Sequence, residues 1–273
     1  MLHTVSQNPE PPPAWPETRL EDLKQIERTL TELRGKYWLC RGQPGVYRNL
    51  RPTFDRGAYE GIKRPKKLKL ERRAIHLFRE NARFFGFVGE KNALKDDVIA
   101  LLVLRQYRVP TRVLDWTLSP WIAAYFACKH GKGDGEIWSF DERSYAAKGE
   151  EQWRKWPKTT RRRSGDPRDF DAELTAFMLE EPPDWFVCVF YGADFPRQNA
   201  QQGAYSMTAH FDRDHAEMIA TLLKETREHH RYIIPKKMKK EVLDWLEKEH
   251  FIRRGSLFPD TAGAAETVCK ELF

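Results

Sequence analysis

Residues 104–120 read Leu-Arg-Gln-Tyr-Arg-Val-Pro-Thr-Arg-Val-Leu-Asp-Trp-Thr-Leu-Ser-Pro and join two predicted helices. The first helix has an apolar face over roughly 94–105, and Pro110 stops it because proline cannot continue a helix. Ser119 and Pro120 are typical of a helix N-cap and first turn, so the second helix begins there. Polar and special residues interrupt what would otherwise be a simple helix-to-strand junction, which marks a candidate functional segment.

Two interpretations of this segment stay open. In one, Arg112 and Asp115 form a buried ion pair, which more often shapes a site than adds stability, and Trp116 supplies an aromatic wall. In the other, the segment is a tightly hydrogen-bonded turn in which Thr111 and Asp115 cap backbone groups.

Two more segments combine arginine, glutamine and glycine. Residues 37–43 read Tyr-Trp-Leu-Cys-Arg-Gly-Gln, a strand that ends in a close-approach glycine and in Arg41, whose planar guanidinium suits phosphate or carboxylate. The plain alternative is that Arg41 pins a loop through backbone carbonyls. Residues 196–205 read Pro-Arg-Gln-Asn-Ala-Gln-Gln-Gly-Ala-Tyr, and their amide side chains can read amide or ribose groups.

The other helix and strand signals do not alternate strictly and show no repeat. A helix is expected from Thr18, which has capping-box spacing with Glu21, to Gly35. This order favours an α+β fold, a small mixed β-sheet flanked by helices, over a doubly wound sheet. The remaining expected elements are helices at 66–85, 119–131, 215–230 and 236–249 and strands at 136–140, 185–191, 203–209 and 232–234.

One domain with an N-terminal arm is predicted. Prolines crowd residues 7–16, so residues 1–17 are interpreted as an extended arm. Residues 18–273 then form a single domain, with the polar stretch 141–184 as an insertion. The apolar side chains of the helix at 66–85 are expected to point inward: Leu70, Ala74, Leu77 and Phe78.

Composition restricts the class of protein. The 273 residues are 40% hydrophobic and 12% aromatic, which is too apolar for a disordered chain. No apolar run reaches the roughly 18 residues of a membrane helix, and the start lacks the pattern of a signal peptide, so we expect a soluble cytoplasmic protein. The net charge of +7 favours anionic partners, although a solvated surface rich in lysine and arginine gives the same balance.

Several chemistries lack their motifs. The four cysteines are scattered, so neither a disulfide framework nor a metal site is predicted. There is no GxSxG, no P-loop and no GxGxxG after a strand, which argues against standard hydrolase, NTPase and dinucleotide-fold proteins. The pair His229-His230 and the basic runs 63–69, 161–163 and 236–240 are interpreted as solvated helix faces, with polyanion contact as the alternative for the basic runs.

Together these segments resemble the FRG family, whose signature is aromatic-x-Arg-Gly-Gln. Arg41, Gly42 and Gln43 match it, with Cys40 directly before the arginine and the aromatic residues slightly earlier. The second segment is similar to the family's block around Pro-Thr-Arg-x-x-Asp-Trp-Thr-x-x-Pro, in which Arg108 replaces a glycine. The matching positions are Gln106, Pro110, Thr111, Arg112, Asp115, Trp116, Thr117 and Pro120. The resemblance continues through 134–138, 197–203 and 255–260.

The resemblance implies a fold similar to that of ADP-ribosyltransferases and an enzyme that handles NAD or another nucleotide, by ADP-ribosyl transfer or NAD cleavage. NAD would be a substrate, no metal is implied, and the protein would act as a toxin or phage-defence effector. The implied partners are a nucleotide, a nucleic acid or a target protein, and no membrane. The alternative is a non-catalytic module that binds nucleic acid or another anionic ligand through the same cleft.

The segments are expected to converge in one cleft, with Arg41 and Gln43 near Arg112, Asp115 and Gln202. The catalytic candidates are Arg41, which would hold phosphate, Gln202, which would touch the ribose, and Asp115, which would orient Arg112. Glutamines stand where a catalytic carboxylate is expected, so Asp115 or Glu71 would supply the negative charge. The candidate binding residues are Gln43, Gln106, Tyr107, Thr111, Arg112, Trp116, Arg197 and Gln201, with Tyr107 or Trp116 stacking on a ring.

Overall fold

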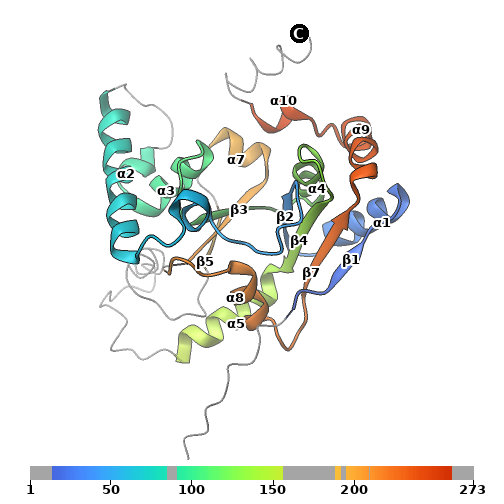
Figure 1. Cartoon of the computed structure of the whole chain (residues 1–273), viewed down its shortest axis with the longest axis horizontal. Coiled ribbons are helices and arrows are strands. Elements are labelled where there is room, and N and C mark those ends of the chain that lie inside the picture. Colours follow the sequence, from blue (N-terminus) through green and yellow to red (C-terminus); the bar gives the residue numbers. More distant parts are fainter. Residues whose placement is uncertain (1–13, 85–90, 156–187, 192–194, 209, 260–273) are drawn as a thin grey trace, which may run out of the picture.

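A computed structural model describes residues 14–84, 91–155, 188–191, 195–208 and 210–259. The described strands form one sheet in the order β1-β7-β4-β2-β3-β6-β5, in which β1 and β7 are parallel and the other neighbours antiparallel. The predicted α+β class with a mixed sheet is therefore confirmed (Figure 1). The strands are β1 Glu17–Arg19, β2 Trp38–Gln43, β3 Val113–Thr117, β4 Gly135–Asp141, β5 Cys188–Tyr191, β6 Gly203–Met207 and β7 His229–Ile234.

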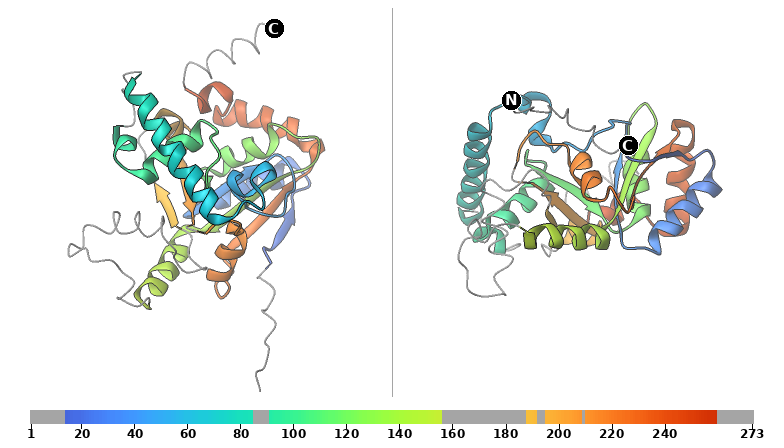
Figure 2. Two further views of the ribbon diagram at one scale, coloured as in Figure 1. Left: turned by 60° about the vertical axis from the view of Figure 1, so that its left-hand side comes forward. Right: turned by 90° about the horizontal axis from the view of Figure 1, so that it is seen from below.

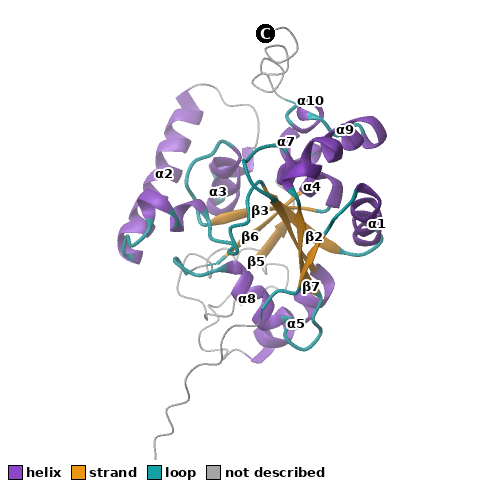
Figure 3. Ribbon diagram, turned by 45° about the vertical axis from the view of Figure 1, so that its right-hand side comes forward, coloured by secondary structure: helices purple, strands orange, loops and turns teal. Residues whose placement is uncertain are grey.

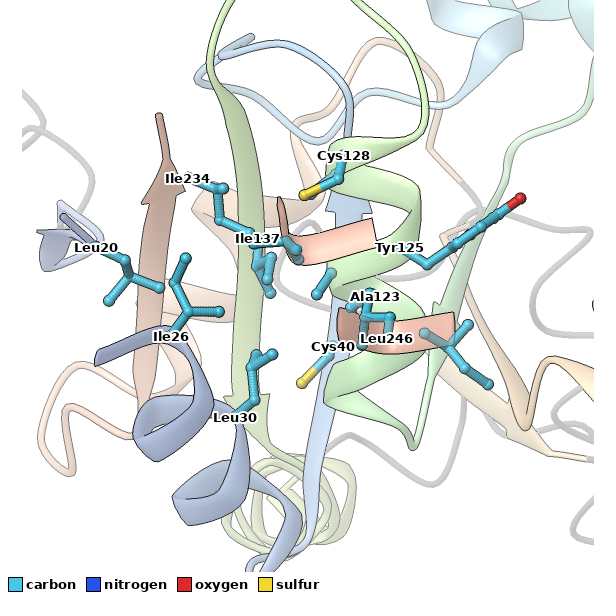
Figure 4. Close-up of a cluster of buried hydrophobic side chains, with 14 of the residues drawn as sticks. Leu20, Ile26, Leu30, Cys40, Ala123, Tyr125, Cys128, Ile137, Ile234 and Leu246 are labelled. Carbon is cyan, nitrogen blue, oxygen red and sulfur yellow. The ribbon is translucent and has the colours of Figure 1, made fainter. Parts of the chain in front are cut away.

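Helices cover both faces of the sheet (Figures 2 and 3). The helices α1, α4 and α9 share one apolar cluster with β2, β4 and β7, and Figure 4 shows its members Ile26, Ala123, Ile137 and Leu246. A second cluster joins α5 and α8 to the opposite face, and a third joins α2 and α3 to β3 and β6. The helices are α1 Leu23–Arg34, α2 Arg64–Phe84, α3 Asp97–Gln106, α4 Pro120–Cys128, α5 Glu142–Lys155, α7 Pro196–Ala200, α8 His215–Leu222, α9 Lys239–His250 and α10 Arg254–Leu257.

The strands β2 and β3 separate in the middle of the sheet. A single register pair, Cys40 with Thr117, joins them, whereas β2 pairs with β4 along its whole length. Beyond that pair the two backbones no longer share a ladder. Side chains from both strands therefore enter the space between them.

The helix α4 lies unusually close to β2 and β4. A Cβ atom added at Gly42 would lie 1.8 Å from the backbone oxygen of Ala123, and one added at Gly135 would lie 2.3 Å from that of Ala127. The predicted N-cap is confirmed, because Ser119 accepts a hydrogen bond from the Ile122 amide. The close approach expected at Gly42 is therefore made by the backbone of α4, which packs directly against β2.

The predicted N-terminal helix begins later than expected. Residues 17–19 form β1, and Thr18 lies 2.9 Å from His230 Nε2 through its hydroxyl. The N-cap is Asp22, which accepts a hydrogen bond from the Gln25 amide, so the predicted capping box at Thr18 is wrong. Pairing with β7 holds this stretch extended, and that tertiary contact outweighs a local capping preference.

Part of the predicted arm is docked on the domain. Trp15 donates from Nε1 to the Ala216 carbonyl at 2.9 Å, and its ring meets the rings of Trp138 and His229 edge-on at 4.9 Å. The predicted division of the chain at residue 17 stays a prediction, and residues 1–13 lie outside the described residues. The predicted insertion begins with α5, and its residues 156–184 also lie outside them.

The inward face of α2 differs from the expected one. Leu70 and Leu77 are 40% and 43% exposed, and the buried positions are Lys67, Glu71, Ile75 and Ala82. Lys67 donates from Nζ to Asp55 and Asp212 at 2.8 and 2.7 Å, so ion pairs replace apolar contacts on this face. Ala74 and Phe78 do pack against the α2–α3 cluster, as expected.

Other surface interpretations are also corrected. His229 and His230 belong to β7 and not to a helix, because α8 ends at Leu222, and His229 is buried beside Trp15. Lys239 of the third basic run is buried and donates to the Pro44 and His130 carbonyls. Among the described residues, no helix is long and apolar enough to cross a membrane.

Substitution of Gly42 by alanine is expected to destabilise the fold by at least about 3 kcal/mol, because backbone atoms of α4 occupy the place of the new methyl group. The matched control is Gly149→Ala in α5, where the added Cβ meets nothing within 4 Å and helix propensity favours alanine. Urea denaturation measures both. A Gly42→Ala protein as stable as the wild type would contradict the close packing of α4.

Stability is expected to fall on acidification through His215. Its ring is fully buried, its Nδ1 lies 2.9 Å from Ser206 Oγ, and burial, aided by the Arg41 charge, lowers its pKa to about 3. The unfolded chain takes up this proton near pH 6.5 and the folded chain does not. Between about pH 6.5 and 3, uptake of this proton by the unfolded chain lowers the free energy of unfolding by up to about 1.4 kcal/mol for each unit by which the pH falls.

Urea denaturation of the wild type and of His215→Gln at several pH values tests this expectation. The variant cannot titrate at this position, so its stability should decline less steeply between pH 6.5 and 4 than that of the wild type. Equal slopes would mean that the buried imidazole does not govern this pH range.

Candidate active site

A cavity of about 320 Å³ lies beside the point where β2 and β3 separate. Residues of all three candidate segments line it, so the predicted convergence in one cleft is confirmed. Lining residues outside those segments come from α4, from the turn after it and from the end of α10. The lining residues are Cys40, Arg41, Gly42, Arg105, Gln106, Arg108, Asp115, Trp116, Thr117, Phe126, Lys129, His130, Arg197, Gln201 and Phe258.

The lining is strongly cationic. Four arginines and one lysine stand against a single carboxylate, that of Asp115. The chain has a net charge of only +7, so a large part of its positive excess is concentrated around one small cavity. Such a concentration of positive charge attracts anionic ligands far more specifically than a diffuse surface charge does.

Asp115 organises the inner end of the cavity. Arg105 donates to Asp115 Oδ2 from Nε at 2.9 Å and from Nη2 at 2.5 Å. Arg41 donates from Nη1 to the Asp115 backbone carbonyl at 2.6 Å and lies 3.7 Å from the carboxylate. One acidic residue therefore holds two guanidinium groups side by side, across the gap between β2 and β3.

The two guanidinium groups differ electrostatically. Burial lowers the pKa of Arg41 to about 10, Asp115 opposes this shift, and the charges of Arg105 and Arg56 add to it. The Asp115 charge raises the pKa of Arg105. Both side chains stay charged at neutral pH. A bound anion would stabilise the charged form of Arg41 more than that of Arg105, because Arg105 already has the Asp115 carboxylate as its partner.

Two phenylalanine rings also line the cavity. Phe126 and Phe258 meet edge-on with ring centroids 6.4 Å apart, and Lys129 Nζ lies 4.8 Å from the Phe258 centroid. The sequence interpretation did not single out either phenylalanine as a site residue. Trp116, expected as a stacking wall, is buried and donates from Nε1 to Ser206 Oγ at 2.8 Å, so little of its ring is available to a ligand.

The third segment contributes Arg197 and Gln201. Arg197 donates from Nη1 to the Gln106 carbonyl at 3.1 Å, and Gln201 donates from Nε2 to the Leu257 carbonyl at 3.0 Å. The structure does not bring Gln202 into the cavity: its side chain is exposed, and its backbone carbonyl accepts a hydrogen bond from the Leu118 amide. The expected approach of Gln202 to Arg41 is therefore not supported by the geometry.

Arg112 pairs with Glu71 and not with Asp115. Its Nε donates to both Glu71 carboxylate oxygens at 3.0 Å, and Nη2 donates to Glu71 Oε2. Both side chains are buried, and neither lines the cavity. The expected Arg112–Asp115 pair is wrong, because Arg112 points toward α2 and the Phe211 ring. Glu71 is consequently no candidate for the catalytic carboxylate.

Other candidate residues also hold the fold around the cavity. Gln43 is buried and donates from Nε2 to Glu136 Oε1 at 3.0 Å. Thr111 accepts hydrogen bonds at its hydroxyl from the Val113 amide and at its carbonyl from the Phe54 amide. The turn interpretation thus fits Thr111, while Asp115 lines the cavity with Arg105 as its partner in place of the expected Arg112.

Gln106 and Tyr107 lie at the end of α3, beside the cavity. Gln106 lines it and donates from Nε2 to the Tyr205 hydroxyl at 2.5 Å. Tyr107 is exposed and lies against Arg197, whose guanidinium is 5.4 Å from the tyrosine ring centroid. The predicted binding roles of both residues stay predictions.

Arg108 ends α3 in a left-handed conformation, with φ at 65°. Its amide donates to the Arg105 carbonyl and the Val109 amide donates to the Leu104 carbonyl, which is the hydrogen-bond pattern of a Schellman motif. Arg108 occupies the position of this motif where glycine is usual, and a side chain there costs about 1–2 kcal/mol. The turn therefore survives the replacement of glycine and gains a cationic side chain.

Among the described residues, no cluster of His, Cys, Asp or Glu could hold a metal ion. The family model of the FRG domain matches residues 36–135, a range that includes the candidate segments 37–43 and 104–120. No curated protein and no solved structure matches the chain. The similarity to ADP-ribosyltransferases accordingly stays an expectation.

Glu71→Gln is expected to destabilise the protein by about 3 kcal/mol or more, because it leaves the Arg112 charge buried without its partner. The control is Glu27→Gln on the exposed side of α1, for which a change within about 0.5 kcal/mol is expected. Thermal and urea denaturation measure both. Full stability of the Glu71→Gln protein would contradict the role of this buried ion pair in the fold.

Proposed function

We propose that the cavity beside the FRG domain's β2–β3 gap binds the phosphate groups of NAD or a related nucleotide, and that the protein cleaves NAD or transfers its ADP-ribosyl group. The observation that carries the proposal is the set of five cations and one carboxylate around a cavity of about 320 Å³. This volume lies within the usual range of about 300–1,000 Å³ for small-ligand sites. A cavity of this size favours a nucleotide over a polymer.

The cavity lining offers partners for the two kinds of group in a nucleotide. Arg41 and Arg105 present guanidinium groups side by side, which suits the oxygens of a pyrophosphate. Phe126 and Phe258 offer half-buried ring surface for a planar base or nicotinamide. A ligand that contacts both the arginines and the phenylalanines would place its ribose between them.

Asp115 is the one carboxylate in the described lining, and it is the proposed source of negative charge in catalysis. In NAD cleavage the bond between ribose C1′ and the nicotinamide nitrogen breaks, and the electron pair leaves with nicotinamide. Water or a nucleophile of a target protein then bonds to C1′ and gives up a proton to solvent. A nearby carboxylate stabilises the positive charge that develops on the ribose. Loss of NAD or modification of a target would suit a toxin or phage-defence effector.

The alternative is a module that binds the same ligands without turnover. It is favoured by the contacts of Asp115, whose carboxylate already accepts two hydrogen bonds from Arg105 and lies 3.7 Å from Arg41. A carboxylate neutralised in this way contributes less to charge stabilisation at C1′.

Isothermal titration with NAD and ADP-ribose, followed by assay of NAD loss and of ADP-ribose transfer to protein or nucleic acid, tests the proposal. The purified chain should bind both ligands, and Arg41→Ala should weaken binding at least about tenfold, since it removes a charged donor to phosphate. Asp115→Asn should lose turnover.

Arg28→Ala is the matched control, because Arg28 is exposed on α1 and the variant loses the same formal charge outside the cavity. Thermal denaturation verifies that each variant folds, and Arg197→Ala replaces Arg41→Ala if the latter does not. Absence of binding by the wild type would refute the proposed function. Binding without NAD loss, or salt-dependent binding of RNA or DNA without turnover, would support the non-catalytic alternative.

A further inference from the structure

Arg108 is the cation of the cavity that has no protein partner in the described part of the chain. Arg105 is bound to the Asp115 carboxylate, and Arg41 donates to the Asp115 carbonyl. Arg197 donates to the Gln106 carbonyl, and Lys129 lies over the Phe258 ring. The guanidinium of Arg108 is exposed at the rim and keeps its five N–H donors available.

The backbone at Arg108 has a conformation that is unfavourable for a residue with a side chain. With φ at 65°, the residue holds the C-terminal position of a Schellman motif that glycine fills at the least conformational cost. An unfavourable conformation that is kept beside a binding cavity is a reason to look for a function of the side chain. Among the described residues, the Arg108 side chain has no hydrogen bond or ion pair that would compensate for the strain.

We infer that Arg108 recognises a terminal phosphate, one that extends from the ligand toward the rim of the cavity. The inference rests on the proposed function, in which the inner guanidinium groups of Arg41 and Arg105 hold bridging phosphates. A terminal phosphate carries more charge than a bridging one and presents several oxygens to a guanidinium fork. Among nucleotides that are otherwise identical, the site therefore prefers the one that carries the additional terminal phosphate, because Arg108 binds that phosphate.

Two ligand pairs that differ by one phosphate test the inference. NADP differs from NAD by a phosphate on the adenosine ribose, and ATP differs from ADP by a phosphate at the end of the chain. Titration calorimetry of the wild-type chain should show at least tenfold tighter binding of the more phosphorylated member in at least one pair. The pair that responds identifies where the terminal phosphate is carried.

Arg108→Gly and Arg108→Asn should abolish this preference, because both side chains tolerate the left-handed conformation and neither carries a charge. Both variants should still bind the less phosphorylated member within about twofold of the wild type, and Arg108→Gly should unfold no earlier on heating. Arg108→Lys should retain part of the preference, and Arg28→Ala should retain all of it.

The outcomes separate this inference from the proposed function. Tight binding of both members of each pair, with a ratio that does not change in the Arg108 variants, would overturn the role of Arg108 and leave the nucleotide site standing. No binding of any of the four nucleotides would overturn both. A preference that persists in Arg108→Gly would assign the terminal phosphate to another cation of the cavity and so refute the inference.

Discussion

The contact between the backbone of α4 and the backbone of β2 sets the geometry of the whole centre of the molecule. Gly42 has no room for a Cβ atom, because the Ala123 carbonyl of α4 lies against its Cα. This contact fixes α4 on the sheet at the place where β2 leaves β3. The side chain of Arg41 then enters the gap between the strands, while Phe126 and Lys129 reach the same cavity from α4. A larger residue at Gly42 would move both walls of the cavity apart.

The charged side chains of the fold have two different roles. The pairs of Glu71 with Arg112 and of Lys67 with Asp55 are buried, so they join α2 to the loops and strand beside it without attracting a ligand. Around the cavity, cations outnumber carboxylates and Asp115 compensates for only part of their charge. Binding of an anion would neutralise the remainder and stabilise the folded state by mass action.

Local sequence signals predicted the elements whose ends depend on local chemistry. The helix after Ser119 begins where its capping residue indicates, because a side-chain oxygen and a proline act within one turn. The same kind of signal failed at Thr18, where pairing with β7 holds the chain extended. It also failed on α2, since apolar periodicity does not anticipate that Lys67 and Glu71 are buried by ion pairs with residues distant in the sequence.

The sequence by itself determined the α+β class, because helix and strand periodicity depends on residues near one another in the chain. The three Arg/Gln/Gly segments were recognised from short motifs, and their resemblance to the FRG family led us to expect them in one cleft. Only the tertiary structure decided which arginine meets which carboxylate. Arg112 and Asp115 are three residues apart on or beside one strand and point to different partners, Glu71 and Arg105. Ion pairs depend on distances of a few ångströms between distant segments, and such distances exist only after the chain has folded.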